Sequence, residues 1–79
     1  MNTFSYNITF NVTDGTNPIE NAKINMGGIR TKTNAQGVAT IKSQGNKSYS
    51  YTVKSENKDD VRGKVSILQE NVAVNVVMN

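Results

Sequence analysis

The sequence predicts an all-β protein, an antiparallel β-sandwich of seven short strands. Fifteen of its 79 residues are Val or Ile against one Leu, and eight Thr raise the number of residues branched at Cβ to 23. Such side chains favour strands over helices. Apolar and polar residues alternate with period two in several segments, and no helical periodicity appears. Turn-forming residues separate these segments at the short spacing typical of sandwiches.

Residues 4–13 are the clearest strand. Every even position is apolar or aromatic and every odd position is polar, which predicts a long strand with one buried face. The strand ends at residues 14–18, DGTNP, which are five consecutive turn formers.

Residues 22–26 form the second predicted strand, with Ala, Ile and Met on one face and Lys and Asn on the other. Gly27 and Gly28 then predict a tight reversal, because glycine adopts positive φ without strain. The third strand follows at residues 29–33.

The NAQG turn at residues 34–37 predicts a positive φ at its glycine. The fourth strand covers residues 38–43, with Ala39 and Ile41 facing inward. Residues 44–46 turn the chain into a fifth strand, in which Tyr49, Tyr51 and Val53 alternate with polar residues.

Residues 55–60 read as a charged loop. The sixth strand spans residues 61–67, and Gly63 inside it predicts a bulge or a close backbone approach. Residues 69–71 form the last turn, and residues 72–78 alternate as the seventh strand.

All five aromatic residues share the parity of the aliphatic residues on their strands. They are Phe4, Tyr6, Phe10, Tyr49 and Tyr51. We therefore expect one core between two sheets, and outward faces without rings on which bases or sugars could stack.

Composition excludes several functional classes. The chain has no Cys and no His, which removes disulfides, thiolate and imidazole metal ligands, and imidazole-based triads. No apolar run exceeds three residues, so no membrane span is expected, and residues 1–15 lack a signal-peptide pattern. The net charge is +3. Lysines recur about every ten residues with acids between them, so we expect no cationic cluster and no nucleic-acid partner.

The six carboxylates all lie in or beside turns, where they act as solvated turn formers. We therefore predict no catalytic residues, no cofactor and no metal site. The candidates for contact with a ligand are polar residues of two loops: Asp14, Asn17, Asn57, Asp59 and Asp60.

Four segments carry a resemblance to small bacterial immunoglobulin-like domains, known as carboxypeptidase-regulatory-like, prealbumin-like or collagen-adhesin B-type repeats. Residues 12–24, VTDGTNPIENAKI, resemble their V-x-d-g-x-x-P-i-x-G-A-x-V opening, with Asn21 where the family has Gly. Residues 33–41, TNAQGVATI, resemble the T-d-x-x-G-x-a-x-f hairpin. Residues 45–53 resemble the G-x-Y-x-v-x-V strand, and residues 63–65 the G-x-v of strand six.

The resemblance implies one Greek-key domain over residues 1–79, a non-catalytic stalk, spacer or adhesin repeat of a larger bacterial cell-surface or secreted protein. Its partners would be neighbouring domains of that protein, and a cell-wall or host glycan or protein. Two alternatives stay open. One is a carbohydrate- or peptide-binding module that uses its end loops, and the other is an interaction domain acting by β-strand augmentation.

Overall fold

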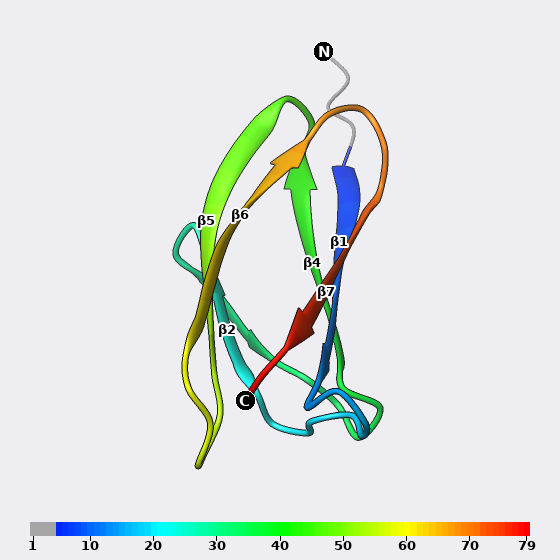
Figure 1. Ribbon diagram of the computed structural model, residues 1–79. Coiled ribbons are helices and arrows are strands. Elements are labelled where there is room, and N and C mark those ends of the chain that lie inside the picture. Colours follow the sequence, from blue (N-terminus) through cyan, green and yellow to red (C-terminus); the bar gives the residue numbers. More distant parts are fainter. Residues whose placement is uncertain (1–4) are drawn as a thin grey trace.

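The computed structural model describes residues 5–79 as seven strands in two sheets (Figure 1). The strands are β1 (Ser5–Thr13), β2 (Lys23–Met26), β3 (Ile29–Lys32), β4 (Val38–Gln44), β5 (Lys47–Lys54), β6 (Val61–Ile67) and β7 (Val72–Val77). One sheet has three strands in the order β4-β1-β7, and the other has four in the order β3-β2-β5-β6. All seven strands lie where the alternation predicts them. Phe4, which we expected to open the first strand, lies outside the described residues.

The expectation of a wholly antiparallel sandwich is wrong for one pair of strands. β1 and β7 run parallel, in a register that pairs Ile8 with Val72 and Thr13 with Val77. Parallel neighbours need a long connection between them, and here the other five strands supply it. Alternation could not reveal this direction, because it reports only which face of a sheet a side chain occupies.

The distribution of strands also differs from that of a constant-type immunoglobulin domain. There the first, second, fourth and fifth strands share a sheet. Here β1 and β4 lie in one sheet, whereas β2 and β5 lie in the other. The short turn at residues 45–46 therefore carries the chain from one sheet to the other, and does not close a hairpin.

The β2–β3 turn is a true hairpin, as the sequence predicts. Gly27 has φ 57° and Gly28 has φ 89°, the two positive values that a two-residue type I′ turn requires. This turn fixes the register of the hairpin, so that Lys23 lies opposite Lys32 and Asn25 opposite Arg30.

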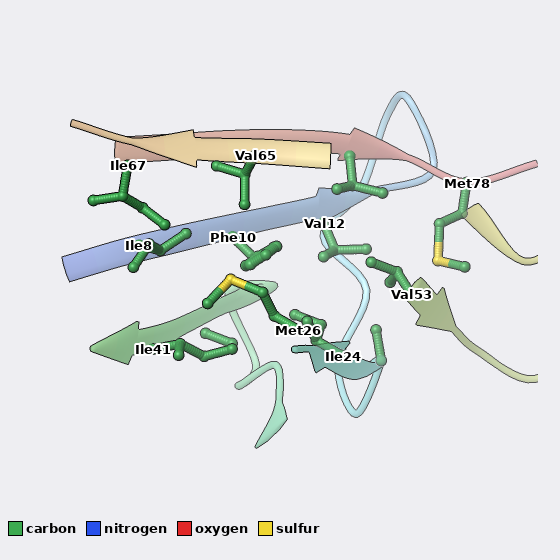
Figure 2. Packing of buried hydrophobic residues seen from close by; sticks show 13 residues of the cluster. Ile8, Phe10, Val12, Ile24, Met26, Ile41, Val53, Val65, Ile67 and Met78 are labelled. Atoms are coloured by element: carbon green, nitrogen blue, oxygen red, sulfur yellow. The ribbon is translucent and has the colours of Figure 1, made fainter. Parts of the chain in front are cut away.

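The core lies between the two sheets and receives side chains from both (Figure 2). Its buried hydrophobic members are Ile8, Phe10, Val12, Ala22, Ile24, Met26, Ala39, Ile41, Val53, Val65, Ile67, Val76 and Met78. The Phe10 ring meets the Tyr51 ring edge to face across the sheets, with centroids 5.2 Å apart and planes at 78°. The inward parity predicted for the aromatics is confirmed for the four that the structure describes.

Gly63 forms no bulge, and a side chain, not another backbone segment, approaches it closely. Its strand partner is Tyr51, and pairing between β5 and β6 continues through both residues. A Cβ at Gly63 would lie 2.5 Å from the Tyr51 hydroxyl oxygen. The glycine therefore makes room for the tyrosine side chain on the core side of the sheet.

The molecule is elongated, with extents of 45 × 20 × 17 Å. Because β1 and β7 run side by side in the same direction, the chain enters β1 at one end of the sandwich and leaves β7 at the other (Figure 1). Residues 5–79 form no helix, and hence none that is long and apolar enough to cross a membrane.

Candidate functional site

The two loops that carry the predicted ligand contacts lie at the same end of the sandwich, on either side of the end of β7. The backbone N–H of Met78 donates to the carbonyl oxygen of Thr13 at 2.8 Å, beside the first loop. The N–H of Asp59, in the second loop, donates to the carbonyl oxygen of Asn79 at 2.9 Å. The structure thus brings together two segments that are about 40 residues apart in the sequence.

Asp14 organises the first loop through its side chain. Its Oδ1 accepts the backbone N–H of Asn17 at 2.7 Å and that of Thr16 at 2.9 Å. These two hydrogen bonds, the one from Asn17 first, hold the pKa of the Asp14 carboxyl below its ordinary value of 3.8, and the positive charge of Lys58 adds to the effect. Asp14 is therefore a turn-forming carboxylate, as its place in the sequence predicts.

The lowered pKa of Asp14 predicts how an Asp14→Asn variant responds to pH. A depressed folded-state pKa contributes stability above the unfolded-state value near 3.8, and this contribution is lost as pH falls through the folded-state pKa. We expect Asp14→Asn to melt at a lower temperature than the wild type at pH 7, and the gap to close below about pH 4. Thermal melts of both proteins from pH 2.5 to 7 measure this. A gap that stays constant over that range contradicts the assigned role.

The other four candidates, like Asp14, make contacts within their own loop or with the strand next to it. The carbonyl of Asn17 accepts the N–H of Asp14 at 3.0 Å, and Asn57 adopts φ 60° in a tight turn. An Asp60 oxygen lies 3.6 Å from the Lys54 ammonium, an exposed ion pair. Asn57 and Asp60 line one open hollow, but Asp14, Asn17 and Asp59 do not. The five candidates therefore do not line one common hollow, and no group of three carboxylates within residues 5–79 is placed to hold a metal ion.

The prediction that the basic residues do not cluster is wrong. On the outward face of the four-stranded sheet, Lys23 of β2 lies directly opposite Lys32 of β3 and Lys54 of β5. The next row across the sheet begins with Arg30 and ends with Arg62.

Lys64 follows one row further along β6. We call these six side chains the basic face: Lys23, Arg30, Lys32, Lys54, Arg62 and Lys64. All six are exposed. All except Lys64 line a shallow, open concavity of about 580 Å³.

Charge is divided unevenly over the molecule. The eleven outward positions on these four strands hold the six cations of the basic face and no carboxylate, a local charge of +6. The other three Lys and all six carboxylates lie elsewhere and leave the rest of the chain at −3, which together recovers the net +3. The basic face therefore carries more positive charge than the chain as a whole.

The three-stranded sheet presents an almost uncharged outer surface to solvent. Its strands contain one charged residue, Lys42. The other outward positions are mostly Asn and Thr, and Asn11 and Asn75 are joined by a side-chain hydrogen bond of 3.3 Å. The two outer surfaces of the same sandwich thus differ in charge, although both are polar.

Part of the basic face could have been found in the sequence. The Gly27–Gly28 hairpin places Lys23 beside Lys32 once its two-residue turn is recognised. The neighbourhood of Lys54 and Arg62 depends on which strand pairs with β2 on its other side, and no local pattern encodes that choice.

Neither a protein-family model nor a curated protein matches this sequence.

Proposed function

We propose that this chain is a non-catalytic spacer module of a larger bacterial cell-surface or secreted protein, of the prealbumin-like, carboxypeptidase-regulatory-like kind. Its partners are then the neighbouring domains of that protein. The module holds those domains apart by contributing its own length.

The observation that carries this proposal is the parallel pairing of β1 with β7. It makes the chain enter and leave at opposite ends of a body 45 Å long, so that modules joined in series extend a rod. Antiparallel first and last strands would return the chain to the end where it started. A tension applied between the two ends acts along β1 and β7 in opposite directions, and their whole hydrogen-bonded ladder resists it together.

Two backbone positions support the family resemblance. Asn21 stands where the family has Gly, and its φ of 62° is one that Asn tolerates better than other non-glycine residues. Gly37 has φ 75° in the segment 33–41, although this segment joins β3 and β4 of different sheets and is therefore not the hairpin that the resemblance implies. Asn21 and Gly37 therefore both have the positive φ that asparagine and glycine tolerate best among the amino acids.

The proposal predicts the shape of a tandem of three copies joined directly end to end. Small-angle X-ray scattering should show a maximum dimension that grows by about 30 Å or more with each added copy, because the chain crosses the body along the nine residues of β1. A matched tandem with long Gly/Ser linkers between the copies serves as the control, and should give a broader distribution of distances. A directly joined tandem whose maximum dimension stays near that of two copies lying side by side contradicts the spacer role.

Of the alternatives, augmentation at the edges of the four-stranded sheet finds no support in the residues there. Its edge strands β3 and β6 carry Arg30 and Lys32, and Arg62 and Lys64, and charged side chains on edge strands oppose pairing with another chain.

A further inference from the structure

We propose that the basic face binds an acidic polysaccharide, a linear glycan that bears anionic groups among its hydroxyls. The binding surface is then the outside of a sheet, and not the end loops. This inference does not depend on the spacer role, because it concerns one surface of the isolated domain.

Protection of sheet edges explains only part of the basic face. Arg30, Lys32, Arg62 and Lys64 lie on edge strands, where charge discourages association with other chains. Lys23 and Lys54 lie on the inner strands β2 and β5, which have no free edge to protect. Their positive charges need another explanation.

The placement of Lys23 also works against folding. Like charges directly opposite each other on neighbouring strands destabilise a sheet, and Lys23 has a lysine opposite it on both sides. Asp60 pairs with Lys54 at 3.6 Å, and this is the one salt bridge that the described chain contains. Lys23 and Lys32 therefore remain as neighbouring cations without a salt bridge within residues 5–79, an arrangement that a bound anion would stabilise.

The remaining side chains of this face determine which polyanion fits. The five outward positions without charge hold hydroxyl and amide groups: Asn25, Ser48, Ser50, Thr52 and Ser66. Such groups exchange hydrogen bonds with sugar hydroxyls. An acidic polysaccharide offers anionic groups for the cations and hydroxyls for these five side chains, so it matches both components of the surface.

Other polyanions match this surface less completely than an acidic glycan does. The eleven outward positions include no aromatic ring, so the bases of a single-stranded nucleic acid find no stacking surface. They include no apolar side chain either, so the face has nothing to insert between lipids. One boundary of the face is acidic, because Glu20, Glu56 and Asp60 line the hollow next to Lys23 and Lys54. We therefore expect the glycan to extend from Lys23 and Lys32 toward Arg30 and Arg62, away from this boundary.

Chemical-shift titration of the ¹⁵N-labelled domain tests the proposal, with four probes at low salt. They are a heparin hexasaccharide, an oligogalacturonate, the neutral chitohexaose and a short DNA duplex. We expect saturable shifts with both acidic glycans, confined to amides of β2, β3, β5 and β6, and an affinity that falls linearly on logarithmic axes as salt rises. Chitohexaose should produce no saturable shift, and the duplex should bind at least tenfold more weakly than the better acidic glycan.

Two triple variants separate the basic face from net charge. Lys23→Thr, Arg30→Thr and Arg62→Thr together remove cations from the face, whereas Lys42→Thr, Lys47→Thr and Lys58→Thr remove the three that lie elsewhere. Each variant lowers the net charge from +3 to zero. We expect the first to lose at least tenfold in affinity for the acidic glycan, and the second to stay within about threefold of the wild type.

Four outcomes would overturn the proposal. They are equal losses of affinity in the two variants, equally tight binding of duplex DNA, equal binding of the neutral glycan, and the absence of saturable binding to either acidic glycan. Threonine suits exposed strand positions, and removal of Lys23 relieves like-charge repulsion, so a far-UV spectrum and a thermal melt should show both variants folded. The tandem-scattering result does not bear on any of these outcomes.

Discussion

Replacing Phe10 with Ala is expected to lower the free energy of unfolding by about 3–5 kcal/mol, because it removes a fully buried ring and leaves a cavity. Phe10 is the largest fully buried side chain of the described chain. It lies in the core on β1 (Figure 2), the central strand of its sheet, and meets Tyr51 of the opposite sheet. A domain of this size has a total stability of about 4–12 kcal/mol, so the variant should be near the limit of folding.

Urea denaturation measures this loss, and two further variants make the result interpretable. Phe10→Leu keeps an apolar side chain but loses the edge-to-face contact with Tyr51, so a smaller loss of about 1–2 kcal/mol is expected. Leu68→Ala truncates a side chain that is 63% exposed, and its effect should stay within about 0.5 kcal/mol. If Phe10→Ala cost no more than Leu68→Ala, the ring could not be the centre of the core.

The second large effect is expected from Gly37→Ala, which should lower the free energy of unfolding by about 2–5 kcal/mol. Gly37 has φ 75°, a conformation that strains alanine. An added Cβ would also overlap the carbonyl oxygen of Val12 and lie 3.0 Å from the Pro18 Cβ. The same Val12 carbonyl accepts the backbone N–H of Ile19 at 3.0 Å, so it cannot move without disturbing the β1–β2 loop.

Gly28→Ala is the matched control for this effect. Gly28 also has a positive φ, 89°, but an added Cβ there meets no atom within 4 Å. Its cost should be the conformational strain alone, about 1–2 kcal/mol. The difference between the free energies of unfolding of the two variants, measured by denaturation, gives the cost of the close contacts around position 37. Equal losses for Gly28→Ala and Gly37→Ala would show that the β1–β2 loop yields freely around position 37.

One buried polar side chain, that of Thr33, links two loops through hydrogen bonds, and no local sequence pattern reveals this link. The Thr33 hydroxyl donates to the carbonyl oxygen of Ile19 at 2.6 Å and accepts the N–H of Ala22 at 2.9 Å, although Thr33 is only 2% exposed. The sequence places Thr33 at the end of a strand, in a motif that the resemblance includes. Its role as the link between two loops appears only when those loops come together in space.

The candidate site shows the same division. The sequence alone predicts that Asp14 is a turn former, and the structure confirms it. An aspartate at the start of a DGTNP segment forms hydrogen bonds to the nearby backbone N–H groups wherever that segment lies. The basic face was missed, because lysines about ten residues apart are separated by roughly one strand and one turn. That spacing looks dispersed along the chain, yet it brings Lys23 and Lys32 directly opposite each other.

Strand positions and inward faces follow from the order of residues alone, because a period of two is a local property of extended backbone. Alternation therefore placed Phe10 in the core and Lys23 on a surface before any neighbour was known. The direction of β7 beside β1, the passage between sheets at residues 45–46 and the meeting of Lys23 with Lys54 are decided by tertiary structure. Hydrogen bonding between strands is nearly indifferent to side-chain identity, so the partners are selected by how both sheets bury their apolar faces in one shared core.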